Sequence, residues 1–135
     1  MRMRWVIPAL LLGSLCLFAR PVLAEGSVVA VGGVEVLRIY AATAGKTADE
    51  RADAVNERLI PILGDSQLKA DDIKLVVLGK TAVKIMVKDR LLVTVTADDG
   101  KVNKLTALQQ AQIWLKHVRK VLPQLVVKPN PNHQG

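Results

Sequence analysis

Three strand-like runs follow one another closely between residues 73 and 96, and this spacing limits how the chain can fold. The runs are Ile73–Gly79, Ala82–Lys88 and Arg90–Thr96. They are rich in valine, isoleucine, leucine and threonine, which fit the pleated surface of a sheet. Parallel neighbours need a crossover of a dozen or more residues, so these short connections require antiparallel pairing.

Two capping-box patterns mark the starts of two helices. Thr47 with Glu50 begins the first, and Thr106 with Gln109 begins the second, because each side chain of such a pair satisfies a backbone amide of the first turn. Apolar residues recur at helical spacing after each start. The stripe predicted for the second helix is Leu108, Ala111, Leu115, Val118 and Leu122.

The first strands are predicted before the first helix. In 27–40, two β-branched runs flank Gly32-Gly33, a pair that accepts the positive φ of a tight hairpin turn. The element order is therefore ββαβββα. We expect an α+β two-layer sandwich, in which two helices cover one face of an antiparallel sheet.

The N-terminus has the pattern of a secretory signal. Arg2 and Arg4 precede the apolar run 5–19, and Val22 and Ala24 occupy the −3 and −1 positions of a cleavage site. The sequence predicts a signal peptide at 1–24 that is cleaved after Ala24, one domain at 25–124, and a disordered proline-containing tail at 125–135. The protein is then exported, to the periplasm or beyond, unless the segment is kept as an anchor.

Charge and cysteine content narrow the functional classes. The predicted signal contains three of the nineteen basic residues, none of the twelve acidic ones and the single cysteine, so the remaining 111 residues have a net charge of +4. This mild excess favours anionic surfaces but is not a nucleic-acid signature, and an exported chain is not expected to meet nucleic acid. The mature chain has no thiol to act as a nucleophile or metal ligand.

Asp98 and Asp99 raise the question of a metal site. A calcium loop uses six to eight oxygens from spaced positions, whereas these carboxylates are adjacent and point apart on an extended chain. The alternative is a turn at the end of a strand, with Gly100 free to take a positive φ. The sequence favours the turn, and no metal site is predicted.

Other catalytic patterns find no support in the sequence. His117 is not part of an H-x-x-x-H or H-E-x-x-H pattern, and neither mature serine lies in G-x-S-x-G. Trp114 and Tyr40 are the only mature aromatic residues, and their separation in sequence does not establish a stacking platform. We therefore predict no catalytic residue, no cofactor and no enzymatic activity.

One face of the sheet is a candidate binding surface. In the middle strand Lys84, Met86 and Lys88 alternate with core-type valines and isoleucine, so they are expected to point away from the helices. Extending the alternation to neighbouring strands places Val36 and Leu92 on the same outer side. The predicted partner-binding residues are Arg38, Tyr40, Lys84, Met86, Lys88, Thr94 and Thr96. A solvated polar face is the competing interpretation.

Two segments, ERADAVNERL (50–59) and LLVTVTADDG (91–100), carry a family resemblance. With the core pair Leu37 and Ile39 and the later Trp114, they resemble the extracytoplasmic domain of bacterial small-conductance mechanosensitive channel proteins. Gly100 departs from the alanine of that pattern. The residues that match are Leu37, Ile39, Glu50, Arg51, Ala52, Arg58, Leu59, Thr94, Val95, Thr96, Asp99 and Trp114.

The resemblance implies a stand-alone copy of that domain and supplies no catalytic residue. We expect an exported, non-enzymatic binding or sensing module of the periplasm or envelope. The alternative is an accessory subunit that docks on an envelope or membrane protein, such as a mechanosensitive channel.

Overall fold

The computed structural model describes residues 26–128, and the predicted α+β class is confirmed. The predicted signal peptide with its cleavage site, and residues 129–135 of the predicted tail, lie outside the described residues. In chain order the elements are β1 (Ser27–Val31), β2 (Val34–Ile39), α1 (Ala48–Leu63), a short 3-10 helix (Ala70–Asp72), β3 (Ile73–Val77), β4 (Ala82–Val87), β5 (Arg90–Thr96), α2 (Ala97–Lys101) and α3 (Ala107–Leu125).

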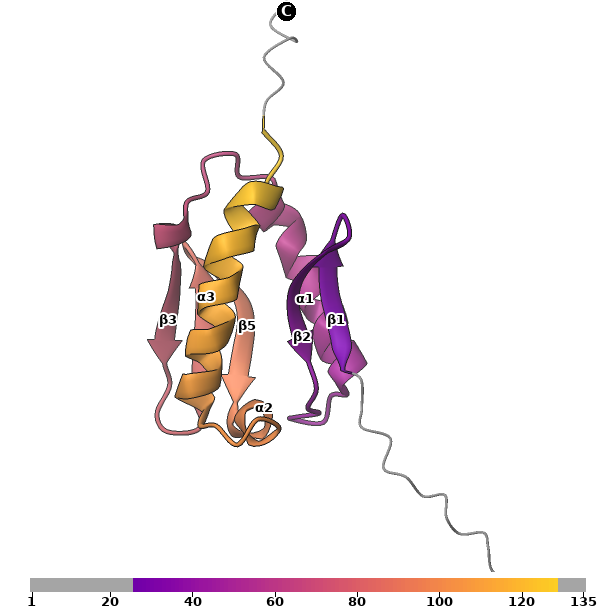
Figure 1. The fold of residues 1–135 in the computed structure, drawn as a ribbon, viewed down its shortest axis with the longest axis vertical. Helices are drawn as coiled ribbons and strands as arrows, with labels where there is room; N and C mark the ends of the chain where they lie inside the picture. Colours follow the sequence, from indigo (N-terminus) through magenta and orange to yellow (C-terminus); the bar gives the residue numbers. More distant parts are fainter. Residues whose placement is uncertain (1–25, 129–135) are drawn as a thin grey trace, which may run out of the picture.

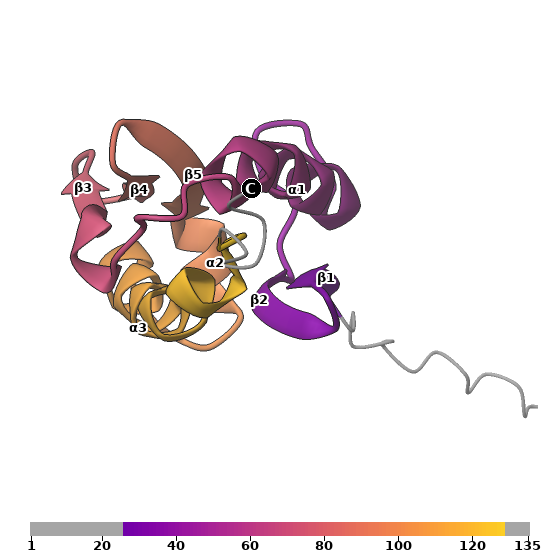
Figure 2. The same cartoon turned by 90° about the horizontal axis from the view of Figure 1, so that it is seen from above.

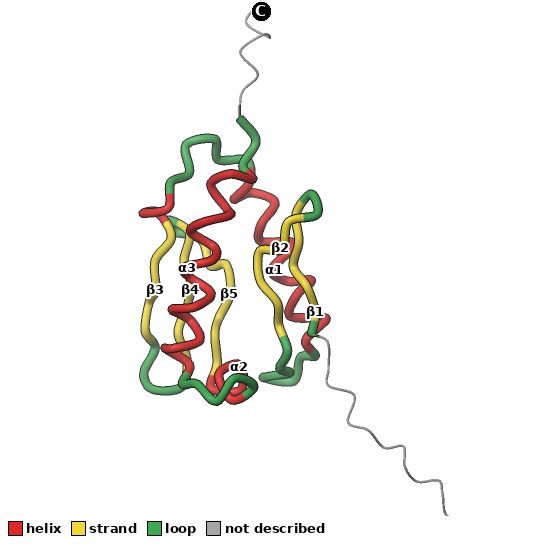
Figure 3. Tube along the Cα trace, in the orientation of Figure 1, coloured by secondary structure: helices red, strands yellow, loops and turns green. Residues whose placement is uncertain are grey.

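The strands form two antiparallel sheets rather than the single sheet expected. β1 pairs with β2, and the second sheet has the order β3-β4-β5. Helix α3 lies across one face of the three-stranded sheet, whereas α1 packs against the β1-β2 hairpin and beside β5 (Figures 1 and 2). The trace in Figure 3 shows the same separation of the two sheets. The two helices therefore do not share one sheet face.

A β-bulge in each sheet changes which side chains are buried. In the hairpin the register shifts between Val29 and Ala30, and Val36 and Leu37 on the opposite strand are both buried. In the second sheet the shift lies at Leu92, which is buried together with its neighbour Val93. The prediction that Val36 and Leu92 face outward was wrong, because alternation with a period of two fails across a bulge.

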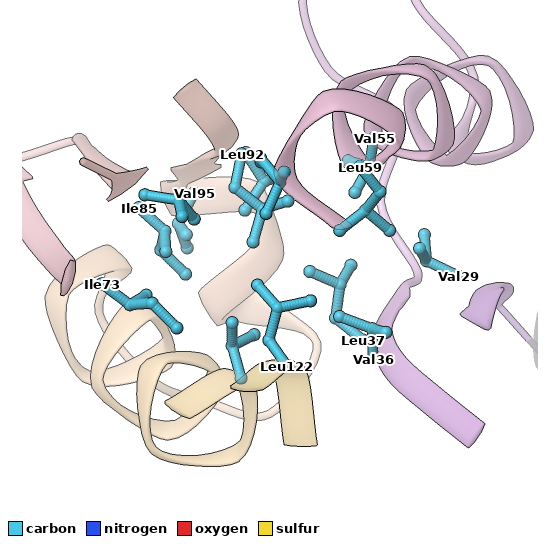
Figure 4. Packing of buried hydrophobic residues seen from close by; sticks show 14 of the residues in the cluster. Val29, Val36, Leu37, Val55, Leu59, Ile73, Ile85, Leu92, Val95 and Leu122 are labelled. Carbon is cyan, nitrogen blue, oxygen red and sulfur yellow. The ribbon is translucent and has the colours of Figure 1, made fainter. Parts of the chain in front are cut away.

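One hydrophobic core joins the five strands to α1 and α3. Figure 4 shows Leu37 from the hairpin, Leu59 from α1, Leu92 from β5 and Leu122 from α3 directed toward a common centre. Each is at most 3% exposed. Burying a leucine side chain contributes about 1.5–3 kcal/mol, so this contact among elements remote in sequence is a main stabilising term.

Both predicted helix starts are confirmed. The Thr47 and Thr106 side chains accept hydrogen bonds from the backbone amides of Glu50 and Gln109, at 3.1 Å in each case. The apolar stripe of α3 holds at Ala111, Val118 and Leu122 and, partly buried, at Leu115. Leu108 is 39% exposed. Its place in the core is taken by Ala107 and Gln110.

The packed chain extends beyond the predicted boundary at residue 124. Leu125 is the last residue of α3, and Val126 is 5% exposed in the core. The Val127 amide then donates to the Leu63 carbonyl at 3.0 Å, which ties this segment to the end of α1. Residues 125–127 therefore do not belong to a disordered tail; the apolar pair Val126-Val127 precedes the prolines on which that prediction relied.

Candidate functional site

A buried ion pair between Arg51 and Asp99 joins α1 to α2, the short helix that directly follows β5. The guanidinium binds the carboxylate in a two-pronged contact, with Nη1 2.7 Å from Oδ1 and Nη2 2.8 Å from Oδ2. The side chains are only 8% and 1% exposed. Arg51 also donates to the carbonyl oxygens of Ala41, at 2.6 Å, and Thr94, at 3.1 Å. Its two terminal nitrogens are therefore fully used within the fold.

The geometry around Asp99 corrects the predicted turn. Residues 97–101 form the short helix α2, which Thr96 caps through the Asp99 amide at 3.4 Å. Asp99 in return accepts from the Thr96 amide at 2.8 Å. The neighbouring Asp98 is half-exposed and lies 3.8 Å from Lys101. The two carboxylates thus have separate structural roles.

Gly100 is required by close packing rather than by a left-handed conformation. It lies inside α2 and does not have the expected positive φ. A Cβ atom at this position would stand 2.3 Å from the Leu105 carbonyl oxygen and 2.8 Å from that of Thr106. This approach brings α2 against the start of α3.

A cleft of about 300 Å³ opens beside this ion pair, between α1 and β5. One wall is a face of α1 with Arg51, Ala54, Val55 and Arg58, which recur at helical spacing. The opposite wall is β5, and a short turn from 43 to 46 forms the rim. That turn is closed by the backbone pairing of Thr43 with Lys46, and Ala44 and Gly45 between them have positive φ. The full lining is Thr43, Ala44, Lys46, Arg51, Ala54, Val55, Arg58, Val93, Thr94 and Thr96.

The cleft lining is cationic and contains no carboxylate. Arg51 is neutralised by Asp99, whereas Arg58 gives one hydrogen bond to the Leu92 carbonyl, at 3.2 Å, and keeps other donors. Lys46 is exposed and forms no ion pair within residues 26–128. Two hydroxyl groups, those of Thr43 and Thr94, add further hydrogen-bonding capacity. This combination favours an anionic group.

The predicted partner-binding residues are divided among several places. Thr94 and Thr96 line the cleft. Lys84 pairs directly with Thr94, so its side chain lies on the same sheet face, one strand away. Met86 is on that face too, since it alternates with buried neighbours along β4.

Lys88 leaves the sheet face at the β4-β5 turn and binds Asp65, with its Nζ 2.5 Å from a carboxylate oxygen. This hydrogen bond raises the pKa of Lys88 and lowers the pKa of Asp65. Both side chains remain substantially exposed, at 44% and 30%. The pair ties the segment after α1 to the β4-β5 turn and does not add to an uncovered basic face.

Arg38 and Tyr40 line a second groove, of about 430 Å³, between β2 and α3. Arg38 binds Glu35 at 2.8 Å, and this hydrogen bond raises the pKa of its guanidinium. Trp114 lies in the same groove, so the fold brings Tyr40 and Trp114, the two aromatic residues of the described range 26–128, to one place. His117 Nε2 is 2.8 Å from the Glu35 carbonyl oxygen. It therefore has a backbone partner across the groove.

Three residues of the cleft, Lys46, Arg58 and Thr43, were not predicted as site residues. Arg51 and Arg58 are seven residues apart, which places them on one helix face, and this spacing was the available signal. Nothing in the sequence indicated that this face would lie beside β5. Among residues 26–128, no three histidine, cysteine or acidic side chains cluster closely enough to hold a metal ion. In the same range, no helix has the length and apolar character needed to cross a membrane.

Comparison with known proteins identifies a family. No curated protein and no solved structure matches the chain. The family model that matches is described as Domain of unknown function (DUF8459), and the match covers residues 27–125, from the first strand to the last residue of α3. Since this match spans well over half of the sequence, the chain belongs to the DUF8459 family.

Proposed function

We propose that the protein is an exported, non-enzymatic binding or sensing module of the periplasm or envelope, and that the cleft between α1 and β5 is its ligand site. The observation that carries this proposal is the cleft itself. It is concave, mixes apolar and polar side chains, and rests on the buried pair formed by Arg51 and Asp99. Ligand sites commonly combine an apolar wall with a few fixed polar groups.

The residues in the cleft suit binding better than catalysis. The lining includes no histidine, carboxylate or thiol, which are the usual general bases and nucleophiles at neutral pH. Asp99 lies behind the cleft and is fully engaged with Arg51 and Thr96. The fixed groups therefore offer recognition without an evident proton acceptor.

The proposal can be tested with a variant that fills the cleft. Ala54 is half-buried in the α1 wall, and Ala54→Phe would occupy the space that a ligand needs. We expect small molecules that co-purify with the wild-type protein, identified by mass spectrometry, to be lost from a folded Ala54→Phe variant. Identical ligand sets on both proteins would place the binding site elsewhere.

Export is tested separately by the mass of the mature protein. The basic start, the apolar run and the small residue at Ala24 motivate cleavage before Glu25. Intact-mass analysis of protein from the periplasm should show Glu25 as the first residue. A chain that retains Met1 and stays with the membrane would instead support the anchor.

The second candidate function is an accessory subunit that docks on a membrane protein. The observation that favours it is the edge strand β3, where Val76, Val77 and the following Leu78 are 46%, 56% and 47% exposed. Apolar side chains on an open strand edge favour pairing with another chain. Val77→Lys should abolish capture of a channel-type partner from envelope extracts while the folded state survives. Unchanged capture would remove β3 from consideration.

A further inference from the structure

We infer that the ligand of the α1-β5 cleft is a small amphiphilic anion, whose carboxylate or phosphate group is attracted by the available cations of the lining, Arg58 and Lys46. This inference rests on the proposed function, since it names the chemistry of that same site. It excludes cationic ligands.

The charge of the lining favours an anion, because two of its three cations keep hydrogen-bond donors that no carboxylate of the described residues engages. Both terminal nitrogens of Arg51 donate to Asp99, Ala41 and Thr94. Arg51 therefore lines the cleft but has few donors left for a ligand. Arg58, half-buried, donates once to Leu92, and Lys46 at the rim has no carboxylate partner within the described range 26–128. These two groups can provide charge-assisted hydrogen bonds to an oxyanion.

The remaining lining favours an apolar portion next to the anionic group. Ala54 and Val55 on α1 face Val93 on β5, and Ala44 stands on the rim. Thr94 adds a hydroxyl group to the lining, whereas the Thr96 hydroxyl is engaged with Asp99. A ligand that presents both an oxyanion and a short aliphatic part would use both kinds of surface.

The volume limits the size of the ligand. At about 30 Å³ for each water-sized unit, a cleft of about 300 Å³ holds on the order of ten non-hydrogen atoms. The part of a ligand that the cleft encloses is therefore about the size of a short organic acid. Octanoate, with about ten non-hydrogen atoms, is therefore a suitable probe.

The test compares octanoate, neutral 1-octanol and inorganic phosphate by calorimetry and by amide chemical shifts of the mature protein. We expect octanoate to bind most tightly and to shift the amides of Ala54, Thr94 and Thr96. Arg58→Gln and Lys46→Gln should each weaken octanoate binding about ten-fold or more, because each removes a charge-assisted hydrogen bond. Lys120→Gln, which removes an exposed charge on α3 outside the cleft, should have no effect.

The outcomes separate this inference from the proposed function. Equal binding of octanoate and octanol, lost in Ala54→Phe but unaffected by Lys46→Gln, would keep the cleft as the site and overturn its anion preference. Phosphate that binds as tightly as octanoate would overturn the apolar requirement. Octanoate binding that survives Ala54→Phe would overturn both proposals. If Arg58→Gln fails to fold, Lys46→Gln decides the charge question, since the Lys46 side chain is exposed at the rim.

Discussion

At the scale of single residues, the pair formed by Arg51 and Asp99 is the most consequential contact. Removing one partner of a buried ion pair leaves an uncompensated charge, which costs about 3–5 kcal/mol, whereas replacing both with apolar residues is often close to neutral. We expect Asp99→Ala to lower the free energy of unfolding by that amount. The double variant Arg51→Met with Asp99→Leu should recover much of the loss.

Urea unfolding of Arg51→Met, Asp99→Leu and the double variant that combines them measures the coupling directly. A loss below about 1 kcal/mol in Asp99→Ala would show that the pair is solvated in solution. Additive losses in the double variant would show that the two side chains act independently. Either result would contradict the four hydrogen bonds that Arg51 donates to Asp99, Ala41 and Thr94 in the structure.

Gly100 gives a second prediction at this scale. Gly100→Ala would force a Cβ against the Leu105 carbonyl oxygen, so we expect a loss of about 1–3 kcal/mol or more in thermal or urea unfolding. Gly64→Ala is the matched control, because its Cβ would meet the nearest atom at an ordinary 3.5 Å and its φ is −77°. The control should be neutral or slightly stabilising. Equal effects at the two glycines would exclude close packing as the cause.

At the scale of elements, the tie between Lys88 and Asp65 predicts a pH dependence. Asp65 has a lowered pKa, so its contribution is present above its ordinary value of 3.8 and is lost as pH falls through the folded value. Lys88 has a raised pKa, so its contribution is present below 10.5 and is lost as pH rises through the folded value. The tie is therefore intact between these limits.

A carboxyl titration followed by NMR checks this sign. Asp65 should titrate at lower pH in the wild-type protein than in Lys88→Met, and added salt should reduce the difference because both groups are exposed. Lys74→Met, on β3 outside this pair, serves as the control. An unchanged Asp65 titration in Lys88→Met would show that the hydrogen bond does not persist in solution.

The sequence predicts those elements that depend on contacts within a few residues, and not those that depend on contacts between distant segments. The cap residues Thr47 and Thr106 and the Gly32-Gly33 turn act over a few residues, so their patterns were sufficient. The bulge at Leu92 and the helix α2 depend on contacts with distant segments, and local pattern did not reveal them. Asp99 was interpreted as a turn residue because its partner lies 48 positions earlier.

At the scale of the whole molecule, the segment after α3 completes the hydrophobic core through Val126. Val126→Ala should lower the free energy of unfolding by about 1–3 kcal/mol, because its buried methyl groups pack in the common core. Val127→Ala is the control, since that side chain is 69% exposed and only its backbone binds Leu63. Equal, small effects in denaturant unfolding would show that the domain ends before Val126.

The candidate site is assembled from elements that only the packing of the whole molecule brings together. The sequence therefore predicted only part of it. Thr94 and Thr96 were selected from strand alternation, and both line the cleft. Arg58 and Lys46 reach it only because α1 and the turn before it lie beside β5, an arrangement set by packing of the core. The seven residues assigned to one outer face are divided because β2 belongs to a different sheet.

The contacts that α1 makes along β5 also limit how many copies of this chain could join through the three-stranded sheet. Arg51 and Arg58 of α1 donate to the carbonyl oxygens of Thr94 and Leu92, so α1 occupies the β5 end of the sheet, and within the described residues β3 is the other end strand. Two chains that met through β3 would use up the one available edge of each. Growth through this sheet would then stop at a pair, because neither chain would keep a second strand edge of it open for pairing.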